Sequence, residues 1–131
     1  MTGKRAADIM TQPVVTVGPD ALLIDAIKLL LRHHLGSLPV VGSAGEMVGI
    51  ISQYDIMNFA LSGNAADTRV EEAMSTGVIS MPPEAELSTV MECLVNRRLH
   101  RVPIVKDSKV VGMVSRRDVL REMLFMYGKY H

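Results

Sequence analysis

Two serine–aspartate pairs, each spaced three residues apart, are the polar groups whose chemistry is clearest in this sequence. Ser52 precedes Asp55 and Ser115 precedes Asp118, and each pair follows a glycine and two apolar residues. A serine that starts a helix with an acidic residue three positions later is typical of a capping box, which needs no ligand. The same geometry offers backbone amides that attract phosphate and a carboxylate that can bind two ribose hydroxyls. Both interpretations stay open, and they can hold together.

The two pairs differ in the charges that surround them. Positive side chains flank the second pair, whereas small, polar or aromatic residues take the matching places in the first. The two sets are His100, Arg101, Arg116 and Arg117 against Gly36, Ser37, Gln53 and Tyr54. Arginine can hold phosphate through two hydrogen bonds, so a phosphorylated ligand suits the second pair better. The alternative is that these arginines are solvated charges paired with acidic neighbours, and for Arg116 we favour neither interpretation.

Other reactive residues give weaker signals. Adjacent His33 and His34 on a helix point to different faces and chelate a metal poorly, so we expect no metal site. Cys93 lies in an apolar helical pattern and is expected to be an inert buried thiol. The sequence shows no nucleophile–base arrangement, no pair of catalytic carboxylates and no Gly-Lys-Ser or Gly-Lys-Thr phosphate loop. We therefore do not expect an enzyme.

The elements that must position these residues occur twice along the chain. Residues 35–41 match residues 99–105, and residues 49–55 match residues 112–118. Each copy has a short β-branched run (14–17 or 78–81), an amphipathic helix, two apolar runs joined by a polar turn, and a second helix. We predict β-α-β-β-α repeats at 7–63 and 68–127, a linker at 64–67 and a tail at 128–131.

Each predicted repeat is too small to stand alone, since its sheet has only three short strands. We therefore expect an α/β (α+β) fold in which the two repeats pack as an internal pair with pseudo-twofold symmetry. The last helix is expected to bury a stripe at helical spacing and to end at Gly128. That stripe comprises Val119, Leu120, Met123, Leu124 and Tyr127.

Composition narrows the class of protein. Lys and Arg number 14 and Asp and Glu number 14, so the formal net charge is +0, whereas a dedicated nucleic-acid binder carries a basic excess. The longest apolar run, 21–31, is too short to span a bilayer. A single cysteine fits a reducing compartment. We expect a cytoplasmic protein that binds no nucleic acid and does not insert into a membrane.

With both motifs present twice, in order and at matched spacing, the chain resembles the cystathionine-beta-synthase-like (CBS) domain pair, or Bateman module. The first copy carries Leu-Pro-Val-Val at 38–41 and Gly-Ile-Ile-Ser-x-x-Asp at 49–55. The second carries Val-Pro-Ile-Val at 102–105 and Gly-Met-Val-Ser-x-x-Asp at 112–118. The openings Ile-Met-Thr at 9–11 and Ala-Met-Ser at 73–75 fit too. The resemblance covers essentially the whole chain, and it implies tandem CBS repeats with a regulatory role.

The resemblance also implies two ligand sites. In the family the motif aspartate binds ribose beside the serine, basic residues near the strand contact phosphates, and adenine lies in an apolar slot. The favoured second site comprises Ile79, His100, Arg101, Val102, Pro103, Ser115, Arg116, Arg117 and Asp118. The weaker first site comprises Val15, Leu38, Pro39, Ser52, Tyr54 and Asp55. The aliphatic members suit a hydrophobic core equally well, and Tyr54 could stack on a base, block the site or pack at a dimer face.

The resulting hypothesis is a stand-alone module that senses AMP, ADP, ATP or S-adenosylmethionine without a required cofactor. It would regulate a partner protein in trans through a shift between two packings of its repeats or of a homodimer. The resemblance also implies a homodimer, since modules of this family commonly pair through their helices, and the apolar second helix supplies the surface. The competing hypothesis is an assembly module whose serine–aspartate pairs are capping boxes and bind no ligand.

Overall fold

The computed structural model describes residues 3–63 and 65–128, which form a mixed helix and strand fold. In chain order the elements are α1 (Ala6–Ile9), α2 (Leu23–His33), β1 (Ser37–Val41), β2 (Met47–Ser52), α3 (Gln53–Ser62), α4 (Val70–Ala73), α5 (Leu87–Asn96), β3 (Arg101–Lys106), β4 (Lys109–Ser115) and α6 (Arg116–Tyr127). β1 pairs antiparallel with β2, and β3 with β4. The predicted α+β class is confirmed. No helix within the described residues is long and apolar enough to cross a membrane.

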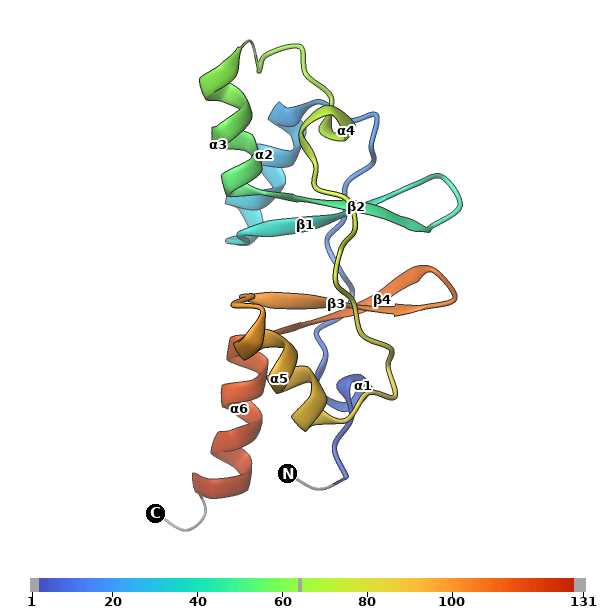
Figure 1. Ribbon diagram of the computed structural model, residues 1–131, viewed down its shortest axis with the longest axis vertical. Coiled ribbons are helices and arrows are strands. Elements are labelled where there is room, and N and C mark those ends of the chain that lie inside the picture. The colour runs from blue at the N-terminus through green and yellow to red at the C-terminus, as the bar shows by residue number, and fades with distance from the viewer. Residues whose placement is uncertain (1–2, 64, 129–131) are drawn as a thin grey trace. The chain divides into compact units, whose positions relative to one another are not determined.

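The elements form two compact units that differ from the sequence repeats in their opening segments. The central unit is Val15–Val78, and the terminal unit combines Met1–Val14 with Ile79–His131. In each unit the helices lie on one face of the β-hairpin (Figure 1). The opening of each repeat thus packs with the body of the other repeat. The predicted repeat boundaries stay a prediction, and Asn64 of the predicted linker and 129–131 of the predicted tail lie outside the described residues.

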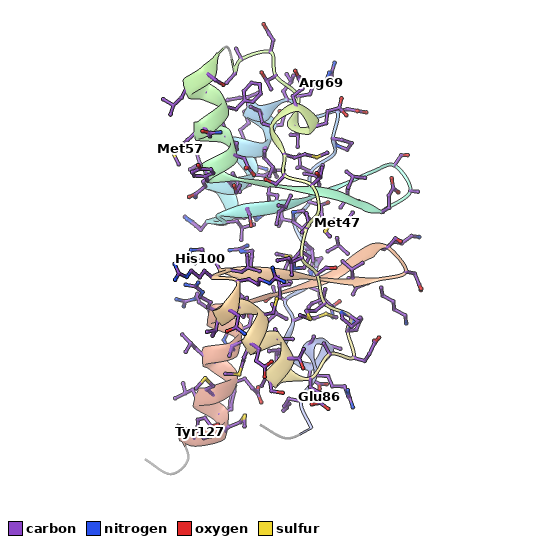
Figure 2. The ribbon with its side chains drawn as sticks, in the orientation of Figure 1. Met47, Met57, Arg69, Glu86, His100 and Tyr127 are labelled. Atoms are coloured by element: carbon purple, nitrogen blue, oxygen red, sulfur yellow. The ribbon has the colours of Figure 1, made fainter. Side chains whose placement is uncertain are left out.

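The arginines that precede α1 and α4 as N-cap residues anchor these exchanged openings through equivalent contacts. In the terminal unit, the Arg5 guanidinium donates to the Glu84 carbonyl at 2.6 Å. In the central unit, the Arg69 guanidinium donates to the Asp20 carbonyl at 2.5 Å; Figure 2 labels this arginine. The same contact made in both units supports the alignment of the two repeats.

Each unit has an aliphatic core between its hairpin and its helices. In the central unit α2 contributes Leu23, Ala26 and Leu30, and the strands contribute Leu38, Val40 and Ile51. In the terminal unit α5 contributes Leu87, Val90 and Leu94, and the strands contribute Val102, Ile104 and Val114. Burial of one such side chain stabilises the fold by roughly 1.5–3 kcal/mol. The cores hold each hairpin against its helices and so fix where α3 and α6 begin.

The prediction of a third strand in each sheet is wrong, because each of the two runs forms only an isolated bridge. The run at 14–17 makes one parallel bridge, between Val17 and Val40, and the run at 78–81 makes one between Met81 and Ile104. Proline follows soon after each bridge, as Pro19 or at 82–83, and proline has no N–H to continue a ladder. A single bridged residue replaces each predicted strand.

The predicted buried stripe of α6 is also wrong in most of its members. Val119 is buried and Met123 half-buried, but Leu120, Leu124 and Tyr127 are exposed. A helix that covers one side of a two-stranded hairpin buries a narrow stripe, so the rest of its apolar face stays open within the unit. Gly128 does follow the last helical residue as its C-cap, with a helical φ of −62°.

Candidate functional site

Asp118 is the centre of a hydrogen-bonded cluster at the start of α6. β4 ends at Ser115, whose Oγ accepts the backbone N–H of Asp118 at 3.1 Å. In return, Asp118 Oδ2 accepts the Ser115 backbone N–H at 2.8 Å and its hydroxyl at 3.0 Å. This is the predicted capping box, and it holds a carboxylate residue that is 6% exposed.

Two residues that sequence reasoning missed complete this cluster. The Thr11 hydroxyl donates to Asp118 Oδ1 at 3.1 Å. The Arg121 guanidinium donates to the same oxygen at 3.1 Å and forms an ion pair with it. Thr11 stands in the repeated opening motif, and Arg121 lies one helical turn after the aspartate, which is a spacing that brings side chains together. Those two patterns are the available sequence signals for them.

Asp55 has the matching place in the central unit. Ser52 Oγ accepts the Asp55 backbone N–H at 3.0 Å, and Asp55 Oδ2 accepts the Ser52 N–H at 3.0 Å. Ser75, from the opening of the second repeat, donates its hydroxyl to Asp55 Oδ1 at 3.1 Å. Asp55 is half-buried, so the two sites share an architecture and the site at Asp118 is the more enclosed one.

Two glycines allow the openings to lie against the strands. A Cβ at Gly112 of β4 would collide with the side chain of Met10. A Cβ at Gly49 of β2 would lie 2.7 Å from Met74 Sδ and 2.8 Å from the carbonyl oxygen of Ser75. The glycines therefore provide the space that brings the hydroxyls of the openings within reach of the two aspartates.

The predicted phosphate-binding cations differ in their surroundings. Arg101, at the start of β3, is half-buried; burial lowers the pKa of its guanidinium, while the charge of Asp118 opposes that shift. Arg116 Nε donates to a backbone carbonyl at 2.8 Å, which commits one of its donors within the protein. His100 and Arg117 are exposed, and His100 lies at the end of the hairpin where β3 starts (Figure 2).

The predicted walls of the adenine slots lie in and beside the two cores. The buried members are Leu38, Pro39, Val102 and Pro103, and the half-buried members are Val15 and Ile79. Tyr54, by contrast, is exposed on α3. Every residue predicted for the second site lies in the terminal unit, and every residue predicted for the first lies in the central unit.

The histidines and the cysteine form no metal-binding group in the part of the chain that the structure describes. Three or more His, Cys, Asp or Glu side chains do not come together there. Cys93, expected to be buried, is a free thiol that is half-buried on α5.

The two repeats match the CBS domain family at residues 6–62 and 70–125. The chain belongs to the CBS domain family. The CBS domain-containing protein YhcV of Bacillus subtilis is 32% identical over 113 residues, which is 86% of this chain and 80% of that protein. An uncharacterized 17.7 kDa protein of Acidianus ambivalens is 33% identical over 121 residues, 92% of this chain and 73% of that protein.

Among solved structures, this CBS chain is similar to the CBS domain pair of protein MJ0100. That structure is a complex with 5′-methylthioadenosine and S-adenosyl-L-methionine. The identity is 29%, the TM-score is 0.80, and the match covers 98% of each chain. The two small hairpins with their helices are therefore the arrangement of a CBS domain pair.

Proposed function

We propose that this protein is a regulatory, non-catalytic CBS pair that senses an adenosine-type ligand, either AMP, ADP, ATP or S-adenosylmethionine. The observation that carries the proposal is the buried Asp118 carboxylate, held at the start of α6 beside the half-buried Arg101. The adenosyl ligands of the similar MJ0100 pair support this ligand class. The ligand would shift the populations of two packings, and a cytoplasmic partner protein would respond to that shift in trans.

The capping box leaves room for a ribose contact. Asp118 Oδ2 accepts both donors of Ser115, so Oδ1 is the oxygen through which a ribose hydroxyl can bind. Oδ1 is shared by Thr11 and by Arg121, whose side chain is 59% exposed. The Asp118 side chain is only 5% exposed, so a ribose hydroxyl that displaces Arg121 must itself take over the hydrogen bond to Oδ1. Capping and ligand binding are therefore compatible at this carboxylate.

The terminal unit supplies the favoured site because its cations suit a phosphate. Burial disfavours the positive charge of Arg101 and lowers its pKa, and an anionic ligand beside it would stabilise that charge. His100 and Arg117 are exposed and so are available to a phosphate. For Arg116 we favour neither a phosphate contact nor a purely structural role, since it already donates to a backbone carbonyl. The proposed adenine walls are Ile79, Val102 and Pro103, beside Ser115 and Asp118.

The central unit supplies the weaker site, around Ser52 and Asp55. Its proposed walls are Val15, Leu38 and Pro39. Gly36 and Ser37 stand where the other repeat has His100 and Arg101, so this site lacks the matching cations. We expect it to hold an uncharged adenosyl ligand or none, with Tyr54 beside it.

Thermal unfolding with a ligand panel tests the proposal. AMP, ADP, ATP, S-adenosylmethionine and 5′-methylthioadenosine are each added at a hundredfold excess over their dissociation constant, where a ligand should stabilise by roughly 2.7 kcal/mol. Asp118→Ala should abolish the shift, measured against the variant's own midpoint, and Asp118→Asn should do so with the side-chain shape retained. Asp55→Ala is the matched control and should matter less. Equal losses, or a loss only at Asp55, would contradict the assignment to the terminal unit.

The second candidate function is ligand-independent assembly, in which the serine–aspartate pairs serve only as caps. The exposed apolar side chains of α3 and α6 favour an interface, and we propose a homodimer under either function. Light scattering during gel filtration measures the mass in solution. A dimer that responds to no member of the ligand panel would favour assembly over sensing.

A further inference from the structure

The Asp118 carboxylate already accepts as many hydrogen bonds as it has acceptor sites. Ser115 donates both its backbone N–H and its hydroxyl to Oδ2. Thr11 donates its hydroxyl, and Arg121 its guanidinium, to Oδ1. A carboxylate offers about four lone-pair sites, two on each oxygen. With four donors in place, one of them must leave before a ribose hydroxyl can bind Asp118.

The Asp55 carboxylate, at the equivalent place in the central unit, has acceptor sites to spare. Among the residues that the structure describes, Ser52 donates its backbone N–H to Oδ2 and Ser75 its hydroxyl to Oδ1. Asn58 stands where the second repeat has Arg121, and its side chain is exposed. Because no cation occupies Oδ1 of Asp55, a ligand can bind this carboxylate without displacing a donor.

Of the donors at Asp118, Arg121 is the one whose release costs least. Ser115 is fixed because its Oγ also accepts the Asp118 N–H at 3.1 Å. Thr11 is held against Met113 by backbone hydrogen bonds of 2.7 and 3.1 Å. Arg121 reaches the carboxylate through a long side chain that is 59% exposed, so water can solvate its guanidinium as it leaves. The ion pair is therefore the contact that an incoming ribose displaces.

We propose that Arg121 is a specificity-determining residue of the terminal unit, because its guanidinium competes with the ribose of the ligand for Asp118 Oδ1. The proposal rests on the proposed adenosine-type ligand and adds the contact that this ligand must displace. An uncharged ligand pays the cost of displacement without compensation. A phosphorylated ligand also gains contacts with the cations around Arg101. Arg121 thus raises the preference of the terminal unit for phosphorylated ligands, and Asn58 imposes no such preference on the central unit.

Calorimetric titration with uncharged 5′-methylthioadenosine tests the competition. Every protein carries Asp55→Ala, so that the titration reports the terminal unit alone. Arg121→Asn introduces the residue of the first repeat, and Arg121→Met removes the donor with a residue that favours helices. We expect each variant to bind 5′-methylthioadenosine about threefold to tenfold more tightly than the Asp55→Ala parent, which is the effect of about one net hydrogen bond. Circular dichroism confirms that each variant is folded.

The matched control is Arg32→Asn. Arg32 lies on α2 of the central unit, and its side chain is exposed, with no hydrogen bond or ion pair to any described residue. This control removes the same charge from the chain without touching Asp118. We expect it to leave the affinity for 5′-methylthioadenosine unchanged.

The salt dependence of binding separates competition from a purely structural role of Arg121. Salt screens the attraction between the exposed guanidinium and the carboxylate. Rising potassium chloride should therefore tighten the binding of 5′-methylthioadenosine to the parent and to the Arg32→Asn control. Both Arg121 variants should lose this gain because they have no ion pair to screen.

Each other result has a defined meaning. Failure of either Arg121 variant to bind 5′-methylthioadenosine more tightly would overturn the proposal, and so would equal salt dependence in the parent and the variants. In both cases the binding measured for the parent would still support the proposed function. If neither 5′-methylthioadenosine nor AMP bound any of these proteins, the terminal unit would have no adenosyl site, and the proposed function would fail together with the competition.

Discussion

The openings of the two repeats pack closely against Gly49 and Gly112. We predict that replacement by alanine destabilises the fold more at Gly49 than at Gly112. At Gly49 a Cβ would lie 2.8 Å from the carbonyl oxygen of Ser75, which accepts the Ile50 N–H at 2.9 Å. Ser75 also donates its own N–H to Ile50 at 2.9 Å. The obstacle at Gly49 is thus backbone held by two hydrogen bonds. At Gly112 the obstacle is the side chain of Met10, which has flexible torsions.

The magnitude follows from these contacts. Overpacking costs roughly 1–3 kcal/mol, and loss of two backbone hydrogen bonds adds about 1 kcal/mol each. Replacement of glycine restricts the unfolded chain and returns up to about 1 kcal/mol where the backbone fits. We expect Gly49→Ala to lower the free energy of unfolding by about 3 kcal/mol, and Gly112→Ala by about 1 kcal/mol. The former corresponds to a fall in melting temperature on the order of 10 °C.

Urea unfolding followed by circular dichroism measures both variants, and double mutants separate the causes. Met10→Ala should recover much of the loss in the Gly112→Ala background because it removes Sδ and Cγ, the two Met10 atoms that lie closest to the added Cβ. Met74→Ala should recover little in the Gly49→Ala background because the Ser75 carbonyl remains. Equal losses in the two glycine variants, or full recovery of Gly49→Ala by Met74→Ala, would refute the packing argument.

Two further predictions concern the polar groups around the carboxylates. Arg101→Met should leave the free energy of unfolding within about 0.5 kcal/mol of the parent, because burial already disfavours this cation. In calorimetric titrations the same variant should bind AMP more weakly, with a smaller effect on uncharged 5′-methylthioadenosine. Equal weakening for the two ligands would show that Arg101 does not contact the phosphate. Thr11→Val should lower the free energy of unfolding by about 1 kcal/mol in urea unfolding, because it removes one donor from the buried Asp118. Ser75→Ala should lower it by less, because Asp55 is only half-buried and water can replace the lost donor. A larger cost at Ser75 would contradict that ranking.

Local features were predictable because they depend on neighbours in the sequence. The capping boxes at Ser52 and Ser115 follow from residue type and spacing, and the hairpins follow from apolar runs around polar turns. The exchange of openings was not predictable in this way. A sequence repeat shows which segments are equivalent, but it does not show whether the opening of one repeat packs against its own repeat or against the other. Thr11 was missed as a partner of Asp118 for that reason. Periodicity likewise identifies the apolar face of α6, but it does not show whether other residues of the same chain bury that face. Leu124 was predicted to be buried for this reason and is exposed.

The exchange also ties each aspartate to the hairpin of the other unit through a short chain segment. Thr11 bonds Asp118 in the terminal unit, and a few residues later Val17 bridges Val40 in the central unit. The segment from Ser75 to Met81 runs the opposite way, from Asp55 to the β3 strand. A ribose hydroxyl on Asp118 Oδ1 would share that oxygen with Thr11, so ligand binding and anchoring of the segment are coupled. Since such coupling is reciprocal, the factor by which a bound ligand changes the equilibrium between anchored and released Thr11 equals the factor by which release of Thr11 changes ligand affinity.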